Sequence, residues 1–545
     1  MFYRLFLLEH LQSTMKEANF DIHVVNDPRA NCLNEIKKID KVWDLLVIGG
    51  GATGLGIALD ATTRGYTVLL VDLSDFAKGT SSRSTKLVHG GVRYLANGEI
   101  KLVREASIER GRLYLNAPHL VKDQVFIIPV YSLWERVKYT IGLKCYDWIA
   151  GKMRLGSSHF ISKDEIISLM PGIKQQNLVG GVLYHDGQFD DARLALNLAQ
   201  SIWDHGGYAL NYCSVVNLLK NADQQICGAT LKDMETEMEY PIQAKSVINA
   251  TGVFADSILQ MDNPLNPKTL SVSQGIHLVL DPSFYPSKEA LMIPKTSDGR
   301  VLFAVPWHGK VVIGTTDTPI KDASLEPIAL EKEIAFILDT AGLYLSKEPT
   351  RADVLSVFAG LRPLASPKDG EQITKEISRG HRILVSPSGL FTIIGGKWTT
   401  YRKMGEDMVN RIEQELHWEP RKTATEALPI HGTILTTDWN DPMYFYGSDA
   451  TVLRNMMNES ANGWISDSLQ IHEAQVIWAI RNEMARTLED VLSRRTRALL
   501  LDAKESVRIA KPVAEIMARE MGKDADWVNN QVTSYWHLAE KYRLQ

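Results

Sequence analysis

Residues 44–72 contain the feature that most restricts the fold, an apolar run that breaks into glycines and resumes with helical spacing. The glycines have the GxGxxG spacing, at Gly49, Gly51 and Gly54. This spacing lets the backbone turn sharply, approach a pyrophosphate closely and pack the following helix on the sheet. A second buried strand at 65–71 ends at Asp72, a carboxylate placed where the hydroxyl pair of a ribose would lie.

The order strand, turn, helix, strand and acid predicts a β-α-β unit that binds the adenosine half of a dinucleotide, with phosphates facing the helix N-terminus. A glycine-bearing turn in an ordinary α/β sheet is the alternative, and it would not require the acid at the end of the second strand. The glycines alone do not decide between FAD and NAD.

Length, charge and cysteine usage limit the remaining possibilities. A chain of 545 residues exceeds the usual size of a single core, so we expect at least two domains. The net charge of -5 gives no reason to expect nucleic-acid binding. The four cysteines include no CxxC pair and suggest neither a disulfide framework nor a metal site, which fits a reducing cytoplasm.

The sequence predicts no secretion signal and no membrane-spanning helix. The first ten residues are apolar but lack a small-residue cleavage site, and no stretch reaches the roughly 20 apolar residues that a bilayer requires. We therefore expect a cytoplasmic protein whose membrane contact, if any, is peripheral. Residues 1–43 are interpreted as an extension ahead of the nucleotide fold.

A polar loop at residues 78–95 follows the second predicted strand. Its serine and threonine hydroxyls can donate to phosphate oxygens, and its paired glycines let the backbone pass close to a flat ring system. A solvated surface loop is the alternative. The next residues, 99–115, have apolar side chains at helical spacing and predict an amphipathic helix.

Several later segments also carry recognisable motifs, at residues 184–194, 248–252, 273–277, 298–307, 313–318, 359–364, 395–403 and 483–495. Together with the glycine turn and the 80–95 loop, these motifs resemble those of the FAD-dependent sn-glycerol-3-phosphate dehydrogenases. The resemblance covers nearly everything from residue 44 onward. It implies an α/β (α+β) fold in which a discontinuous, Rossmann-like FAD-binding domain is interleaved with an antiparallel-sheet substrate domain over residues 44–428. An all-α domain follows at 429–545.

The resemblance implies non-covalent FAD, held by residues from four parts of the chain. These residues are Gly49, Gly51, Ala52, Thr53, Gly54, Asp72, Thr80, Ser81, Ser82, Ser84, Thr85, His89, Gly90, Gly91, Gly252, Gly396, Lys397 and Thr399. The family more often has Glu at position 72, so Asp72 would reach the ribose with a shorter arm. A helix N-terminus after two glycines, with Lys397 beside it, would stabilise the negative charge of a reduced flavin; a plain helix start is the alternative.

The substrate half is expected to take in residues 187–191 and 264–379, which are rich in candidate anion binders. Arginine recognises a phosphate in planar, bidentate fashion, and we predict Arg362 and Arg379 as the phosphate clamp. Arg362 stands in an apolar Gly-Leu-Arg-Pro-Leu sequence, where an unpaired charge would be costly. A surface cation is the alternative for any single arginine. By resemblance, the pocket also includes Arg93, Tyr94 and Lys397.

The implied reaction is oxidation of sn-glycerol 3-phosphate to dihydroxyacetone phosphate, with hydride leaving C2 for flavin N5. It needs a base for the C2 hydroxyl proton. His277 is the candidate because the unperturbed pKa of histidine is about 6.5; a core histidine is the alternative, and His308 is the second candidate base. With Arg362 and Lys397, His277 completes the predicted catalytic set.

An amphipathic segment at residues 133–154 predicts either membrane contact or internal packing. Its apolar stripe, Trp134, Val137, Ile141, Cys145 and Trp148, is flanked by cations, which is typical of an interfacial helix. Packing on the C-terminal domain is the alternative. If the segment binds the inner face of the cytoplasmic membrane, electrons would pass to a membrane quinone. A homodimer is left open as the assembly.

Beyond about residue 429 the sequence predicts helices, one of them with Ile477, Ile480, Met484, Leu488 and Val491 on one apolar face. The arginines of this region alternate with acids, which predicts a solvated, ion-paired surface. These arginines are Arg481, Arg486, Arg494, Arg495 and Arg497.

Three other functions remain open. A glycerol-3-phosphate oxidase that forms hydrogen peroxide shares the core, although the extra insertion typical of those oxidases is not seen. An amine or amino-acid oxidase would not require several phosphate-binding cations. A non-catalytic flavin-binding electron carrier would require no substrate site.

Overall fold

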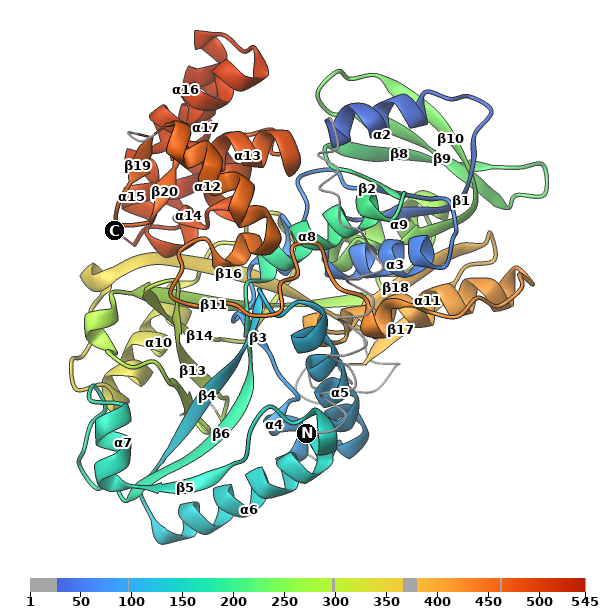
Figure 1. Ribbon diagram of the computed structural model, residues 1–545. Helices are drawn as coiled ribbons and strands as arrows, with labels where there is room; N and C mark the ends of the chain where they lie inside the picture. The colour runs from blue at the N-terminus through green and yellow to red at the C-terminus, as the bar shows by residue number, and fades with distance from the viewer. Residues whose placement is uncertain (1–26, 97, 297–298, 366–379, 461–462, 545) are drawn as a thin grey trace.

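The computed structural model describes residues 27–544 apart from 97, 297–298, 366–379 and 461–462, and it combines two large sheets with a helical C-terminal domain (Figure 1). In the first sheet, β18, β10, β1, β2 and β7 lie side by side in parallel, β17 extends the β18 edge, and the β8–β9 hairpin continues from β10. The bounds are β1 Val42–Ile48, β2 Val68–Val71, β7 Tyr208–Leu210, β8 Cys213–Lys220, β9 Ile226–Asp233, β10 Glu239–Asn249, β17 His381–Val385 and β18 Leu390–Gly395.

The central strands of this sheet read as unbroken apolar runs because helices cover them. Residues 45–48 and 68–71 are fully buried, as expected for parallel strands packed on both faces. Helix α3 (Ala52–Thr63) packs against α8 (Asp191–Asp204) and α11 (Tyr401–Glu415). The predicted nucleotide unit and its return strand, β10 beside β1, are confirmed.

The second sheet is antiparallel apart from the β4–β12 pair, among the strands that the structure describes. The long pair of β11 and β16, at one edge of this sheet, places His277 opposite Phe358 and Gly275 opposite Gly360. The bounds are β3 Leu87–Val88, β4 Val121–Val130, β5 His159–Ser162, β6 Gly180–Phe189, β11 Leu270–Leu280, β12 Ala290–Ile293, β13 Leu302–Trp307, β14 Lys310–Gly314, β15 Thr318–Ile320 and β16 Val354–Ala365.

The chain crosses between the two sheets several times. It builds β1 and β2 in the first sheet, β3 to β6 in the second, β7 to β10 in the first, β11 to β16 in the second, and β17 and β18 in the first. The predicted interleaving of a discontinuous FAD-binding domain with an antiparallel-sheet domain is therefore confirmed.

Helices cover the outer surfaces of both sheets (Figure 1). They are α2 Pro28–Ile36, α4 Val92–Ala96, α5 Ile100–Asn116, α6 Leu133–Ala150, α7 Lys163–Leu169, α9 Ala255–Asp262 and α10 Glu331–Tyr344. Helix α2 belongs to the stretch interpreted as an extension, and it packs on the first sheet through buried Cys32 and an ion pair between Arg29 and Asp233.

The C-terminal domain is helical, as predicted. Its helices are α12 Ala450–Glu459, α13 Glu473–Asn482, α14 Ala498–Leu501, α15 Ala503–Arg508, α16 Ala510–Met521 and α17 Ala525–Glu540, with a small hairpin of β19 Trp464–Ser466 and β20 Ile471–His472.

The prediction of a single helix through residues 477–491 is wrong. Helix α13 ends at Asn482, and the backbone leaves the helical path at Met484, which has a φ of 51°. The chain then runs along the FAD-binding domain, where Glu483 pairs with Arg193 at 2.7 Å. This buried ion pair holds the segment on the neighbouring domain instead of on a continued helix.

The solvated arginine surface is wrong for three of its five members. Arg494, Arg495 and Arg497 are buried and pair with acids of the FAD-binding domain, whereas Arg481 and Arg486 pair at the surface. Alternation of charges predicts ion pairs correctly but does not say whether the partner lies on the same element or on another domain.

Candidate active site

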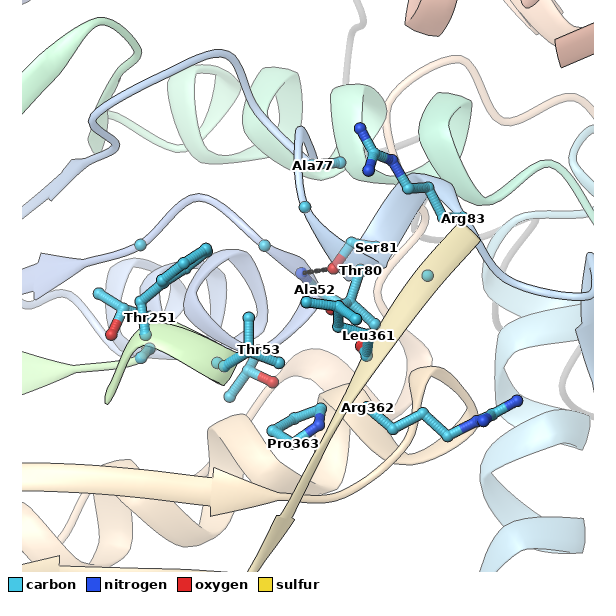
Figure 2. A pocket seen from close by; sticks show the side chains of 18 of the residues that line it. Ala52, Thr53, Ala77, Thr80, Ser81, Arg83, Thr251, Leu361, Arg362 and Pro363 are labelled. Carbon is cyan, nitrogen blue, oxygen red and sulfur yellow. Dashed lines mark hydrogen bonds between the residues drawn. The ribbon is translucent and has the colours of Figure 1, made fainter. Parts of the chain in front are cut away.

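A cavity of about 600 Å³ lies between the two sheets. Figure 2 shows Ala52 and Thr53, at the start of α3, facing Leu361, Arg362 and Pro363 of β16 across it. Its lining is drawn from residues 48–49, 51–53, 72–74, 77–81, 83–85, 250–254, 360–364 and 395–399, together with Gly275 and His277 of β11.

The three motif glycines have different structural roles at this cavity. A Cβ at Gly49 would lie 2.6 Å from the carbonyl oxygen of Ala250, and one at Gly54 would lie 1.8 Å from the carbonyl oxygen of Gly49. Among the described residues, a Cβ at Gly51 would meet only Ser81 Oγ, at 3.1 Å, and Gly51 lines the cavity. Gly49 and Gly54 therefore serve the turn itself, while Gly51 keeps the cavity wall open.

Asp72 lies at the end of β2, as predicted, and lines the same cavity. Its Oδ2 accepts the backbone N–H of Gly50 at 2.6 Å, and its Oδ1 accepts that of Ser74 at 2.8 Å. Burial raises the pKa of Asp72 to about 6. A half-buried carboxylate beside an open glycine turn and a helix N-terminus fits the ribose and pyrophosphate of a dinucleotide.

The polar loop is held to its surroundings by its own hydroxyl groups. Ser81 Oγ accepts the backbone N–H of Ala52 at 2.9 Å, so the loop touches the first residue of α3 (Figure 2). Thr80 Oγ1 donates to the carbonyl oxygen of Leu361 at 2.6 Å. Ser84 donates to Asp191 at 2.7 Å. These contacts join the nucleotide turn to the strand that carries Arg362.

Four predicted cofactor residues lie outside the cavity lining: Gly54, Ser82, Gly90 and Gly91. The carbonyl oxygen of Ser82 accepts a hydrogen bond from Lys86 Nζ at 2.7 Å. A Cβ at Gly90 would lie 2.3 Å from the hydroxyl of Tyr146, and one at Gly91 would lie 2.2 Å from the ring of Tyr94. The two glycines thus allow close packing by aromatic side chains. The remaining predicted cofactor residues all line the cavity.

His277 lies on β11 and is 2% exposed. Its Nε2 is 2.9 Å from Thr85 Oγ1, its ring stacks on Phe358 with centroids 4.9 Å apart, and its Nδ1 has no hydrogen-bond partner among the described residues. Burial, followed by the positive charges of Arg362 and Lys86, holds the pKa of His277 well below its ordinary value. The ring is therefore neutral at physiological pH.

The second candidate base has a different environment. His308 Nε2 lies 3.0 Å from Asp190 Oδ2 and 3.4 Å from the hydroxyl of Tyr444, and His308 does not line the cavity. Of the two candidates, His277 alone faces the space that a substrate would occupy.

Of the predicted substrate residues, Tyr94, His277, Arg362 and Lys397 line the cavity. Lys397 Nζ lies 3.7 Å from the ring centroid of Tyr94. Arg93 belongs to α4, and Arg379 lies outside the described residues.

Sequence reasoning missed several lining residues, including Lys78, Arg83, Cys213, Phe303 and Trp398. Trp398 stands between two predicted residues, and its Nε1 donates to the carbonyl oxygen of Ser81 at 2.8 Å. Its position in the sequence was a usable signal. Cys213 and Phe303 stand in ordinary strand sequences, which offer no such signal.

Comparison with known proteins agrees with this geometry. A family model described as FAD dependent oxidoreductase matches residues 44–402, and one described as the C-terminal domain of alpha-glycerophosphate oxidase matches residues 392–527. The chain is 39% identical to the mitochondrial glycerol-3-phosphate dehydrogenase of Macaca fascicularis over 540 residues, covering 92% of this chain and 73% of that protein. It is 36% identical to the Schizosaccharomyces pombe enzyme of the same name, covering 91% and 87%.

A solved structure leads to the same family. The glycerol-3-phosphate dehydrogenase from Bacillus halodurans, complexed with FAD, superimposes with a TM-score of 0.77 at 30% identity and covers 95% of this chain and 98% of its own. The expectation of FAD is therefore confirmed. The family models, the relatives and the cavity agree, and the chain belongs to the FAD-dependent glycerol-3-phosphate dehydrogenase family.

Proposed function

We propose that this chain oxidises sn-glycerol 3-phosphate to dihydroxyacetone phosphate by hydride transfer from C2 and that a membrane quinone takes the electrons. The observation that carries the proposal is a single cavity that joins a dinucleotide turn to a buried neutral histidine and an arginine. An amine oxidase would not require the arginine, and an electron carrier would require neither side chain.

Proton removal is assigned to His277. Its neutral ring accepts the proton of the C2 hydroxyl, and Thr85 fixes the orientation of the ring by its contact at Nε2. Bound FAD supplies the two-electron acceptor for the hydride that leaves C2.

Phosphate recognition is assigned to Arg362 and Arg379, and Arg93 and Tyr94 are proposed to close the pocket. Figure 2 shows the Arg362 side chain extending away from the nucleotide turn, so a phosphate bound there would not compete with the pyrophosphate of FAD. Lys397 is proposed to lie near the flavin and the reacting carbon, where its charge stabilises developing negative charge.

Anaerobic titration with sn-glycerol 3-phosphate tests substrate and chemistry together. We expect full bleaching of the flavin absorbance, whereas glycerol should bleach it only at far higher concentration. An electron carrier would show no bleaching with either compound. Oxygen consumption without added acceptor separates a dehydrogenase from an oxidase, because an oxidase would consume oxygen at the rate of substrate oxidation.

The quinone part of the proposal rests on α6. Its apolar stripe is exposed, with Trp134 at 73%, Ile141 at 60% and Trp148 at 83%, and packing of the stripe on the C-terminal domain is therefore wrong. Helix α6 packs through its opposite face on α5 and β6, and it lies far from the C-terminal domain (Figure 1).

Exposed tryptophans flanked by cations are typical of a helix that lies in the headgroup region of a membrane. The flanking cations Arg136, Lys138, Lys144, Lys152 and Arg154 are all exposed. Within the residues that the structure describes, no helix is both long and apolar enough to cross a bilayer. We infer that α6 binds a membrane surface, which would place the enzyme beside a quinone pool.

A further inference from the structure

The 313–318 motif has no part in the reaction as described so far, yet its turn surrounds the guanidinium of Arg362. Nη1 of Arg362 lies 3.3 Å from Asp317 Oδ1, and Nη2 lies 3.1 Å from Thr315 Oγ1 and 2.9 Å from the carbonyl oxygen of Thr316. We propose that Asp317 is a positioning residue that orients Arg362 for bidentate binding of the substrate phosphate. This inference rests on the proposed role of Arg362 as the phosphate clamp.

The turn that carries Asp317 is anchored by hydrogen bonds to a buried carboxylate. It connects β14 to β15, and its anchor is Glu333 near the start of α10, a carboxylate that is 2% exposed. Glu333 accepts hydrogen bonds from Thr316 Oγ1 at 2.8 Å, Thr318 Oγ1 at 2.7 Å, Gln274 Nε2 at 2.8 Å and the backbone N–H of Leu330 at 3.1 Å.

The same turn is tied to the strand that carries the base. Thr316 Oγ1 accepts the backbone N–H of Ile276, the neighbour of His277, at 3.0 Å. Asp317 Oδ1 also accepts the hydroxyl of Ser273, which lies opposite Arg362 in the β11–β16 register. The positions of the guanidinium and the imidazole are therefore set by one connected group of hydrogen bonds.

Gly275 provides the space for this arrangement. A Cβ at this position would lie 2.2 Å from Nη2 and 2.7 Å from Cζ of Arg362. Gly275 faces Gly360 across the strand pair, so neither neighbour blocks the path of the guanidinium over β11. The absence of a side chain at Gly275 and the carboxylate of Asp317 are independent features. Both define the same position for the guanidinium of Arg362.

A carboxylate beside a phosphate-binding arginine has two opposing effects. It repels the phosphate dianion, and it fixes the planar guanidinium in the orientation that bidentate recognition requires. If orientation dominates, removing the charge of Asp317 weakens phosphate binding. If repulsion dominates, the same change strengthens it. The sign of the effect therefore decides between the two.

The test is a double-mutant cycle on the oxidised holoenzyme, with dihydroxyacetone phosphate as the probe and calorimetry as the readout. Asp317→Asn should weaken binding about tenfold, which lies within the usual coupling of residues in contact. In Arg362→Ala, the added Asp317→Asn change should have almost no further effect. Binding of dihydroxyacetone, which has no phosphate, should be the same in all four proteins.

Gly275→Ala is the second variant, because it moves the guanidinium without altering any charge. It should show the same phosphate-specific loss as Asp317→Asn. Asp322→Asn is the matched control, since Asp322 is exposed and pairs loosely with exposed Lys268 at 3.8 Å, and it should bind like the wild type. Flavin content and thermal unfolding midpoint report whether each variant keeps the fold.

Two results would overturn the positioning role: equal or tighter binding by Asp317→Asn, or additive effects in the cycle. A different result would overturn the proposed clamp itself, namely wild-type affinity of Arg362→Ala for dihydroxyacetone phosphate. The two failures are therefore distinguishable in one set of titrations.

Discussion

His277 is suited to the role of base because of its surroundings. The ring is enclosed by Phe358 on one face and held by Thr85 at its edge, and two nearby cations oppose its protonation. A histidine in such a place binds a proton less readily than one in water. Its usefulness as a base thus depends on tertiary neighbours that its own stretch of sequence does not contain.

The depressed pKa of His277 predicts how activity and stability change with pH. In the unfolded chain His277 takes up a proton at about pH 6.5, whereas in the folded chain it does so only at lower pH. The stabilising contribution of the neutral ring is therefore fully present above pH 6.5 and is lost as the pH falls through the pKa of the folded state. Flavin reduction should likewise persist below pH 6.5. Stopped-flow bleaching against pH measures this, and an acid limb at or above pH 6.5 would contradict the assignment.

Replacing the base should slow the chemical step while leaving the cofactor in place. His277→Gln is expected to lower the rate of flavin reduction by about 10²-fold, the usual contribution of a general base, with normal FAD content. His308→Gln is the matched control and should reduce at close to the wild-type rate, because His308 lies outside the cavity. If the control is the damaged variant, the base is His308.

The motif glycines predict two distinct defects. Gly51→Val places a branched side chain in the cavity wall and should give folded but colourless protein. Gly54→Ala places a methyl group 1.8 Å from a backbone oxygen and should lower the thermal unfolding midpoint before it affects colour. Absorbance spectra and calorimetry of both variants check this division. Normal FAD content in Gly51→Val would remove the basis for the assigned pyrophosphate site.

Among the elements, α6 has two faces with separate roles. Its buried face includes Tyr146, which donates to Asp186 at 2.9 Å, and Asp147, which accepts the hydroxyl of Ser158 at 2.6 Å. Its other face carries the exposed stripe. The helix is therefore held firmly on the protein while its apolar side chains remain available.

Membrane binding should disappear when the stripe is made acidic. Trp134→Glu combined with Trp148→Glu removes apolar contact area and adds charges that anionic lipids repel, so the enzyme should leave the membrane fraction and keep its dye-linked activity. Trp536→Glu combined with Leu343→Glu is the control, because both residues are exposed on other helices. Flotation with vesicles measures the difference. Equal flotation of both double variants would locate membrane contact elsewhere.

For the molecule as a whole, buried ion pairs join the C-terminal domain to the FAD-binding domain. Asp75 pairs with Arg494 and Arg495, and Arg193 pairs with Glu483, with all of these side chains almost fully buried. Their charges are costly to bury unless each has its partner. The interface therefore tolerates neither loss of one partner nor protonation of the acids.

Asp75→Ala would leave two arginines at this interface without their shared carboxylate. Breaking a buried pair in this way costs about 3–5 kcal/mol, so the free energy of unfolding should fall by that order. Chemical denaturation measures the loss, and limited proteolysis should cut between the domains first. Asp322→Asn, at an exposed pair, should change the free energy of unfolding by less than about 1 kcal/mol.

The same interface predicts acid sensitivity. The positive charges of Arg494 and Lys78 lower the pKa of Glu489 to about 2, and those of Arg495 and Arg494 lower the pKa of Asp75. The unfolded carboxylates titrate at about pH 4, so this stability is present above pH 4 and is lost as pH falls through the folded values. Unfolding measured from pH 5 to 2 should show a steeper loss for the wild type than for Asp75→Ala.

The sequence was sufficient to predict the local secondary-structure elements and to identify the family. An apolar run, a glycine spacing and an acid at 44–72 specify a strand, a turn, a helix and a strand because each depends on neighbours within a few residues. The apolar period at 99–115 likewise gave α5, Ile100–Asn116. Residue chemistry and local sequence context, together with the family resemblance, also selected His277, Arg362 and Lys397, which all line the cavity.

Only the tertiary structure decided how these residues are held. Thr85 and His277 are 192 positions apart, and Asp75 meets Arg495 from 420 positions away, so no local pattern records either contact. The path of residues 483–497 follows from buried ion pairs with another domain, which override the helical period. Gly275 has no local turn to explain it; its reason is the guanidinium that lies above it.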